Sequence, residues 1–381
     1  MSTTTATTTV GVIGCGNIVA QYMETLSKFT NVKVCAVSDL VRDKAEAVRE
    51  KWSIEKAITV DELLADPSID IVLNLTIPLA HDEVTRNALN AGKHVYSEKP
   101  LTDSFETARE LIELADSKNL ALGCAPDTVM GSTWQLAREI IDSGEIGEIR
   151  GALASMQSPG PEHWHPSPAF YYDHGGGPVM DMGPYYIHAL VTLLGPINTV
   201  AAMARKSSET RSVPEGAPAG GLKMPVNIKT HASALLAFDA GFFATCFMSF
   251  DVQHSRVPDI EIYGSKGTME IHTPNNFAKE NDPGLGLVTL RMRDPLAFQA
   301  EETVVERAAG PAVNGRGIGV ADMAQAINEQ RPLDTIRASG KLALHALEVM
   351  EAVPRASDTQ AAQKMTTTCA RPEAVANGWV Y

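Results

Sequence analysis

The sequence has few cysteines, no clusters of positive charge and no long apolar run. Five of its 381 residues are cysteine and none forms a C-x-x-C pair, which indicates reduced cytoplasmic thiols rather than a disulfide framework or zinc knuckle. The formal net charge of −14, without any Lys/Arg-rich stretch, argues against binding to nucleic acid or anionic lipid. No run of about 18 apolar residues is present, which excludes a spanning helix. We therefore expect a cytoplasmic protein without nucleic-acid or membrane partners.

The length predicts two domains, because one domain typically takes roughly 150 residues. The Thr-rich start, 2–9, lacks Lys and Arg and is expected to be a short frayed tail rather than a signal peptide. From residue 10 to 124, strand-length apolar runs alternate with helical patterns, which predicts a doubly wound parallel sheet, a Rossmann fold, with helices on both faces. The expected strands are 10–13, 32–37, 69–75, 94–97 and 120–124. Pro126 follows the last of them, so we expect a cofactor domain over 1–126 and a second domain over 127–381.

The second domain has a different pattern of longer strand-like runs separated by turn residues. It is expected to be an α/β domain with a large, mainly antiparallel open sheet. The expected strands are 148–157, 229–238, 242–250, 260–263 and 268–271. Exposed loops are expected at 207–225 and 273–286, and helices at 320–329 and 342–350.

A glycine-rich turn lies directly after the first expected strand and before a helix. Backbone N–H groups and the helix dipole at such a turn can receive a pyrophosphate. Val19 stands at the third position of G-x-G-x-x-G, and a lone glycine turn is often only a tight connection. Asp39 follows the second strand at the spacing of a residue that accepts both ribose hydroxyls, which favours dinucleotide binding. The residues expected to contact the cofactor here are Gly14, Gly16, Asn17, Ile18 and Asp39.

Asp39 also favours NAD over NADP, because a carboxylate at this place repels a 2′-phosphate. Arg42 weakens that argument, since a guanidinium three residues later can hold such a phosphate if Asp39 turns away. The alternative for Arg42 is a solvated charge on the next helix. We expect NAD as the cofactor and retain Arg42 as a cofactor-binding candidate.

One lysine and a set of three polar residues stand at positions suited to catalysis. Lys99, between Glu98 and Pro100, ends a strand at the carboxyl edge of the sheet, where doubly wound folds bind ligands. Taken alone, this motif favours the alternative of a loop with a solvated lysine. Asp181, Tyr185 and His188 are spaced i, i+4 and i+7 after a glycine run at 175–177, so they share one face of a helix. Spacing alone leaves a solvent-facing stripe equally open.

Aromatic and imidazole groups precede that glycine run, in the segments 162–166 and 170–174. Trp and Tyr rings can stack on the apolar face of a sugar, and His163 and His165 can add hydrogen bonds. This combination suits a carbohydrate pocket, since pockets pair apolar walls with few polar anchors. An aromatic loop packed over the sheet is the alternative. The histidine spacing lacks a closed ligand set, so no metal is expected.

Four motifs follow one another along the chain: Gly14-x-Gly16, Thr76-x-Pro78-x-x-His81, Glu98-Lys99-Pro100, and Gly175-Gly176-Gly177 leading to Asp181-x-Gly183-x-Tyr185. In order and spacing they closely resemble the Gfo/Idh/MocA oxidoreductases. The resemblance continues through Ile260-Glu261-Ile262-Tyr263-Gly264 and Gly319-Val320-Ala321-Asp322-Met323, so it covers about 10–350.

The resemblance implies an NAD(P)-dependent enzyme that oxidises or reduces sugars, inositols, glycosides or related cyclic polyols. It also implies a homodimer or homotetramer joined through the C-terminal sheet. By position it adds Thr76, Pro78, His81, Glu98 and Lys99 to the cofactor-binding residues.

In the active site, the resemblance makes Lys99 the active-site lysine and Asp181 the aspartate near substrate. Tyr185 stands where the inositol-dehydrogenase branch has histidine and where the glucose–fructose oxidoreductase and dihydrodiol-dehydrogenase branches have tyrosine. His188 stands where many members carry aspartate, so substrate identity does not transfer from the inositol enzymes.

The chemistry requires a base within hydrogen-bond reach of the substrate hydroxyl while hydride moves to nicotinamide. Tyr185 can serve if its pKa is lowered from about 10, and an ammonium such as Lys99 lowers it by stabilising phenolate. Asp181 can orient Lys99 or accept a second hydroxyl. The expected substrate-binding residues are Lys99, His163, His165, Asp181, Tyr185 and His188.

Two other functions stay open. Some proteins resembling this family use tightly held NAD to oxidise a sugar transiently and cleave a glycosidic bond. A dinucleotide-sensing regulator can also be built on the same fold. The joint presence of Lys99, Asp181 and Tyr185 argues against the regulator, because a sensor does not need a proton relay.

Overall fold

The chain divides into two compact units. The computed structural model describes residues 7–272, 287–293, 302–308 and 315–375. The first unit comprises Met1–Ser132, Pro311–Leu344 and Pro372–Tyr381, and the second comprises Thr133–Gly310 and His345–Arg371. The chain thus leaves the first unit twice, after Ser132 and after Leu344, and returns to it twice. The roles predicted for 1–126 and 127–381 stay predictions.

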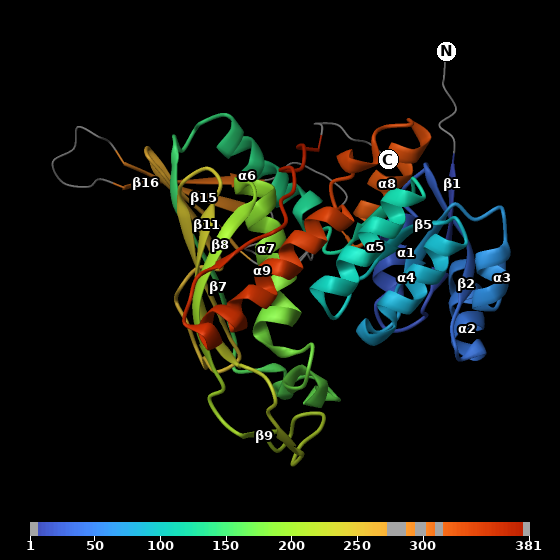
Figure 1. Cartoon of the computed structure of the whole chain (residues 1–381), viewed down its shortest axis with the longest axis horizontal. Coiled ribbons are helices and arrows are strands. Elements are labelled where there is room, and N and C mark those ends of the chain that lie inside the picture. The colour runs from blue at the N-terminus through green and yellow to red at the C-terminus, as the bar shows by residue number, and fades with distance from the viewer. Residues whose placement is uncertain (1–6, 273–286, 294–301, 309–314, 376–381) are drawn as a thin grey trace. The chain divides into compact units, whose positions relative to one another are not determined.

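A six-stranded parallel sheet forms the centre of the first unit (Figure 1). Its order is β3-β2-β1-β4-β5-β6, and every neighbouring pair is parallel. The order reverses between β1 and β4, which is the switch point where doubly wound sheets bind ligands. The predicted Rossmann sheet is confirmed. The strands are β1 (Thr8–Ile13), β2 (Val32–Ser38), β3 (Lys56–Ala57), β4 (Ile71–Asn74), β5 (His94–Ser97) and β6 (Leu122–Cys124).

Helices connect these strands and begin at recognisable caps. Thr59 and Glu62 form a capping box at the start of α3, and the Ser104 side chain accepts from the Thr107 amide at the start of α5. Helix α8 comes from the returning segment and packs on β1, β6 and α1. The helices are α1 (Val19–Leu26), α2 (Arg42–Trp52), α3 (Val60–Ala65), α4 (His81–Asn90), α5 (Phe105–Ser117) and α8 (Ile318–Asn328).

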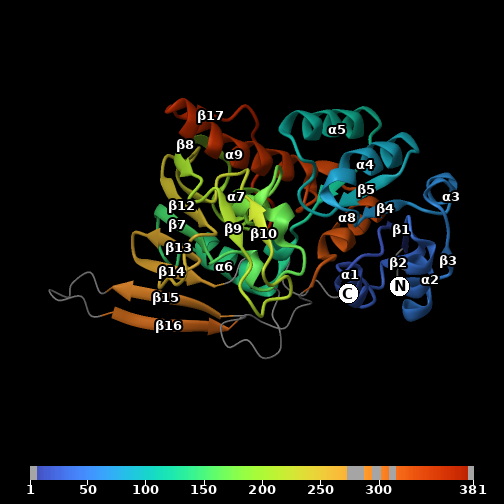
Figure 2. The ribbon, with the colours of Figure 1, turned by 90° about the horizontal axis from the view of Figure 1, so that it is seen from below.

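The second unit contains a nine-stranded sheet in the order β16-β15-β14-β13-β7-β12-β11-β8-β17. Figure 2 shows most of these strands side by side. Among the described pairs of neighbouring strands in this sheet, β7–β12 is parallel and the others are antiparallel. The predicted mainly antiparallel sheet is therefore confirmed. The strands are β7 (Ile149–Gln157), β8 (Ile197–Arg205), β11 (His231–Phe238), β12 (Phe243–Ser249), β13 (Ile260–Gly264), β14 (Gly267–Ile271), β15 (Leu287–Arg293), β16 (Glu302–Ala308) and β17 (Gln363–Lys364).

Part of the loop expected at 207–225 is instead a small antiparallel ribbon, β9 (Thr210–Ser212) with β10 (Lys223–Pro225). The backbone groups of the ribbon pair with each other, which a composition rich in Ser, Pro and Gly did not indicate. The other expected loop, 273–286, lies outside the described residues.

Helix α7 (Gly177–Leu194) covers one face of this sheet, in contact with β7, β11 and β12. Alternation along β11 turns Ala234 and Leu236 inward, whereas Leu235 is half exposed on the opposite face. Two further helices begin near the limits of the unit, α6 (Ser132–Asp142) and α9 (Gly340–Thr359), and α9 continues past Pro354. The helix expected at 342–350 is therefore longer than the sequence indicated.

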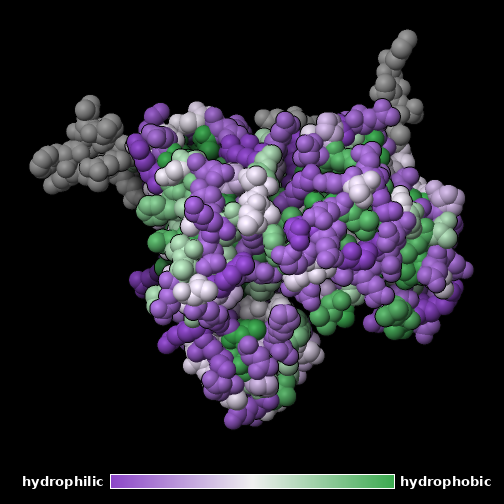
Figure 3. All heavy atoms as spheres, viewed as in Figure 1, coloured by the Kyte–Doolittle hydropathy of each residue, from purple (hydrophilic) through white to green (hydrophobic). Residues whose placement is uncertain are grey.

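Figure 3 shows hydrophilic side chains over most of the face in view, with separate smaller apolar areas between them. Among the described residues, no helix combines the length and apolar character needed to cross a membrane.

Candidate functional site

The glycine turn follows β1 at the carboxyl edge of the first sheet. Gly14 has φ +103°, and a Cβ there would lie 2.6 Å from the Leu75 carbonyl, so only glycine fits this turn without strain. A Cβ on Gly16 would meet nothing within 4 Å. Helix α1 then begins after Ile18 without a side-chain cap. The turn therefore combines open space with uncapped backbone N–H groups, which fits a pyrophosphate.

Asp39 lies beside this turn and is held by backbone donors. Its Oδ2 accepts from the Cys15 amide at 2.8 Å, and its Oδ1 accepts from the Val41 amide at 2.8 Å. Arg42 donates instead to Glu46 at 3.1 Å and to the Ala57 carbonyl at 3.3 Å. The carboxylate is thus fixed at the end of β2, while the guanidinium has partners on its own helix and on β3.

An apolar rim borders the same edge. Four large apolar side chains are exposed among the described residues of the first unit, and all four follow β2 or β4 at their carboxyl ends. Leu40 is fully exposed and Leu79 is 77 % exposed. The four are Leu40, Val41, Ile77 and Leu79. Exposed apolar side chains gathered at one edge are typical of a ligand surface.

Beyond β4, the predicted motif residues form a connected loop. Thr76 donates its hydroxyl to Asn74 Oδ1 at 2.7 Å, and Pro78 begins a short 3₁₀ turn. The His81 ring lies 2.6 Å from the Pro100 carbonyl oxygen and 3.1 Å from that of Thr76, and burial lowers its pKa. His81 thus joins the ends of β4 and β5 and is 1 % exposed. Its predicted contact with the cofactor stays a prediction.

Glu98 anchors the predicted catalytic lysine. One carboxylate oxygen accepts from the Lys99 amide at 2.8 Å. The other accepts from the Tyr22 hydroxyl at 2.9 Å and from Arg316 at 3.2 Å. Glu98 is 8 % exposed, so these partners compensate a largely buried charge. The arrangement fixes the backbone from which the Lys99 side chain projects.

Asp127, which sequence analysis missed, ties the returning segment to the end of β6. Its Oδ2 accepts from the amides of Gly317 and Gly319 at 2.7 and 3.0 Å. Burial raises its pKa, while these two hydrogen bonds oppose the rise. Arg316 and Asp127 are far from their partners in sequence, so no local motif indicates them.

Helix α7 carries the other predicted catalytic residues. Asp181 is half-buried, Tyr185 is 4 % exposed and His188 is 2 % exposed. The sequence left a solvent-facing stripe open, and the burial of Tyr185 and His188 removes that alternative. His188 Nδ1 lies 2.7 Å from the Pro184 carbonyl oxygen. Its predicted contact with substrate stays a prediction.

The segment before α7 forms an exposed group of rings, here called the aromatic platform: Trp164, His165, Phe170 and Tyr171. The His165 ring lies 5.2 Å from those of Trp164 and Tyr171, edge to face in both cases. Trp164 is 61 % exposed and Phe170 is 54 % exposed. His163 is exposed in the adjoining 3₁₀ turn, Pro161–His163.

The predicted residues thus fall into two sets. The cofactor candidates and Lys99 belong to the first unit, whereas Asp181, Tyr185 and the three histidines of the substrate set belong to the second. Each set is built locally by its own unit. Over the described ranges, no group of three or more His, Cys, Asp or Glu residues is placed to hold a metal ion.

Comparison with known proteins gives consistent matches to both units. Residues 8–125 match an oxidoreductase family with an NAD-binding Rossmann fold, and 134–270 match a Gfo/Idh/MocA C-terminal domain. The dTDP-3,4-didehydro-2,6-dideoxy-alpha-D-glucose 3-reductase of Saccharopolyspora spinosa is 28 % identical over 324 residues, covering 83 % of this chain and 90 % of that protein. An uncharacterized oxidoreductase of Schizosaccharomyces pombe is 30 % identical over 60 % of this chain, and the match spans only 61 % of that protein.

Among solved structures, an NAD binding oxidoreductase from Klebsiella pneumoniae has the same fold. It superposes with a TM-score of 0.78 at 20 % identity, over 95 % of this chain and 99 % of that one.

Proposed function

Because the chain belongs to the Gfo/Idh/MocA oxidoreductase family, we propose that it transfers a hydride between a nicotinamide dinucleotide and a secondary alcohol or ketone of a sugar or cyclic polyol. The observation that carries the proposal is the cofactor edge of the first unit. Open space at Gly16, an uncapped helix and an exposed apolar rim meet there. Nicotinamide, when bound, supplies the hydride acceptor or donor.

NAD is the proposed cofactor. The turn at 14–18 receives the pyrophosphate, and Asp39 accepts the ribose hydroxyls with the oxygen lone pairs left over from its backbone bonds. A 2′-phosphate would meet this carboxylate, and Arg42 is engaged by Glu46 rather than turned toward it. The loop from Thr76 to His81 and Glu98 complete the proposed binding residues.

Tyr185 is the proposed proton acceptor for alcohol oxidation, and Lys99 is the cation that favours its phenolate. Asp181, one helical turn before Tyr185, orients Lys99 or accepts a second substrate hydroxyl. In ketone reduction the same pair returns the proton. His163, His165 and His188 are the remaining proposed substrate contacts.

A sugar-like substrate is supported by the aromatic platform. Exposed rings can stack on the apolar face of a pyranose or cyclitol, and the neighbouring imidazoles can donate and accept hydrogen bonds. The Saccharopolyspora relative, whose name is that of a sugar reductase, points in the same direction.

The protein is proposed to form a homodimer or homotetramer through the outer face of the second sheet. Met203, Leu235 and Phe243 are exposed there by 82, 50 and 62 %, and exposed apolar side chains gathered on one face can mark a contact with another subunit. Light scattering that returns the 40.8 kDa monomer mass would refute this assembly.

The first experiment follows nicotinamide absorbance with NAD and, separately, NADP. The panel is D-glucose, myo-inositol, 1,5-anhydro-D-glucitol and methyl β-D-glucoside. Tyr185→Phe should lower kcat by about 10² to 10⁴ and leave NADH affinity unchanged, since only the proton acceptor is lost. Tyr186→Phe, at an equally buried neighbouring tyrosine, is the matched control and should retain activity. Near-normal turnover of Tyr185→Phe would refute its role, and NAD binding without turnover on any sugar would refute the proposed reaction.

A further inference from the structure

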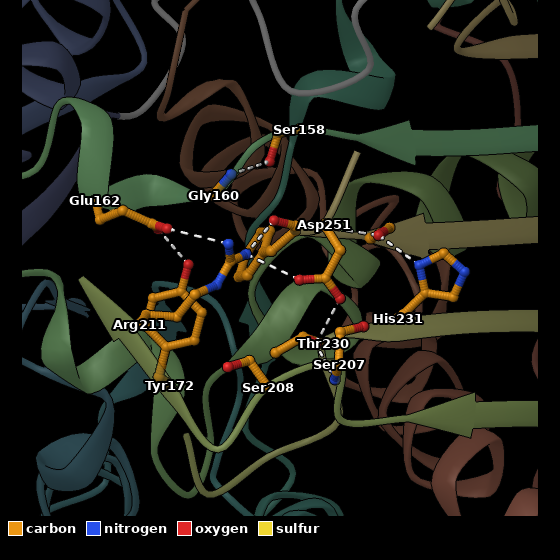
Figure 4. A network of polar contacts seen from close by, with 12 residues as sticks. Ser158, Gly160, Glu162, Tyr172, Ser207, Ser208, Arg211, Thr230, His231 and Asp251 are labelled. Atoms are coloured by element: carbon orange, nitrogen blue, oxygen red, sulfur yellow. Dashed lines mark hydrogen bonds and ion pairs between the residues drawn. The ribbon is translucent and has the colours of Figure 1, made fainter. Parts of the chain in front are cut away.

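Arg211, on the small ribbon β9–β10, lies at the centre of a polar network in the second unit (Figure 4). Its guanidinium lies 3.4 Å from Glu162 and stacks over the Tyr172 ring, 5.4 Å from the ring centroid. The Tyr172 hydroxyl donates to the same Glu162 carboxylate. Arg211 therefore joins the ribbon to the two 3₁₀ turns at Pro161–His163 and Pro168–Tyr172.

The other side of the guanidinium is held at the end of β12. Arg211 donates to Asp251 at 2.9 Å and to the Phe250 carbonyl. The second Asp251 oxygen accepts from the Thr230 hydroxyl at 2.6 Å. The Arg211 side chain is only 17 % exposed. Its planar fork thus has partners on both sides, which fixes it in one geometry.

Gly160 adds a steric constraint on Glu162 and Tyr172. It has φ +108°, and a Cβ there would overlap the Glu162 carboxylate and the Tyr172 hydroxyl. These two groups therefore fill the space beside the Gly160 backbone, and Glu162 is 2 % exposed. A carboxylate buried to this degree needs its charged partner.

The aromatic platform lies between these anchors in the sequence. Glu162 lies two residues before Trp164, the first platform residue, and Tyr172 immediately follows Tyr171, the last. Because Arg211 holds both anchors, its loss would release the platform while leaving the rings themselves unchanged.

We propose that Arg211 is a positioning residue that sets the affinity for the sugar ring by holding the aromatic platform in place. The proposal rests on the sugar oxidoreductase function proposed above. The partners described above for Arg211 all belong to the second unit, and none of them is a proposed catalytic residue, so its effect should fall on KM rather than on kcat.

Arg211→Lys tests this inference, because an ammonium keeps the charge but cannot engage Glu162 and Asp251 with a planar fork. The KM for the sugar of the panel that wild type turns over fastest should rise about tenfold, with kcat within about twofold and NADH affinity unchanged. Acrylamide quenching of Trp164 fluorescence, obtained by difference from a Trp164→Phe background, should increase. Glu162→Gln, which keeps the shape of the side chain, should change both readouts in the same direction. Arg150→Lys, at a pair whose arginine is 62 % exposed, is the control.

Unchanged KM and quenching in Arg211→Lys would overturn the proposal. An equal fall in kcat and NADH affinity would also overturn it, because that pattern shows general loss of structure. Quenching needs no turnover, so an inactive wild type with altered quenching in the variant refutes the reaction but supports positioning by Arg211.

Discussion

Acidification should weaken the second unit through His188. Its Nδ1 lies beside the Pro184 carbonyl, so this nitrogen carries the hydrogen, and Nε2 has no hydrogen-bond partner among the described residues. Protonation would place an N–H and a positive charge where nothing accepts it. Burial lowers the His188 pKa from 6.5 to about 4; the Pro184 bond opposes this shift and the charge of His345 adds to it.

The magnitude follows from linkage between protonation and folding. Between pH 6.5 and pH 4 the unfolded chain binds a proton at His188 that the folded chain does not, so stability falls as pH falls. The loss in unfolding free energy is about 2 kcal/mol by pH 5 and about 3 kcal/mol by pH 4. Above pH 7 both states are neutral at this residue and the contribution is constant.

His188→Leu replaces the titrating imidazole with an apolar side chain of similar length. At pH 7 its stability should stay within about 1 kcal/mol of wild type, because one hydrogen bond and one unpaired buried nitrogen are lost together. Guanidinium titrations at pH 7, 6, 5 and 4 measure the difference between the two curves. Leu190→Met, a buried neighbour without a titrating group, should keep the wild-type pH slope. Parallel wild-type and His188→Leu curves would refute the reasoning.

Four further substitutions test other contacts. Gly16→Ala should fold with wild-type stability yet bind NADH more weakly in a fluorescence titration. Gly14→Ala should also lose about 2 kcal/mol of unfolding free energy, because the position has a positive φ and an added Cβ would clash with the backbone. Arg316→Gln should cost about 3 kcal/mol in denaturant titrations, since it leaves Glu98 buried without its cation; an unchanged midpoint would contradict this. Hydrogen bonds from two threonines outweigh the effect of burial and lower the pKa of Glu348. Wild type should therefore lose stability as pH falls below about 4.5, because the unfolded chain then binds a proton that the folded chain does not. Glu348→Gln should lose less stability over the same range, which calorimetry would measure.

Hydrophobic pattern and turn chemistry predicted most of the fold. Five strands of the first sheet are short apolar runs between helical segments, so they could be read directly, whereas the two-residue strand β3 could not. Strand β8 was missed because its burial alternates only weakly, and β16 because polar side chains such as Glu302 and Glu306 interrupt it. The helix α8 was predicted, but its return to the first unit was not, because nothing local encodes which sheet a helix covers.

In the candidate site, too, some residues could be predicted from the sequence and others could not. Gly14, Asp39 and Lys99 stand at the ends of strands and could be found from spacing. The partners that hold them could not, because a pair such as Glu98 and Arg316 is brought together only by the chain's return. Arg211 belongs to the ribbon that the sequence presented as a loop, so its network with Glu162 was hidden for the same reason.

The return of the chain to the first unit also has a consequence for synthesis. During translation, residues 1–132 leave the ribosome before the segment that completes their sheet. At a rate of about 5 to 20 residues per second, the intervening residues take about 10 to 35 s to be made. Throughout that interval the edge of β6 that pairs with Ser339, and the Asp127 carboxylate that binds the Gly319 amide, have no partners. The nascent first unit therefore acquires these two contacts only when the returning segment emerges.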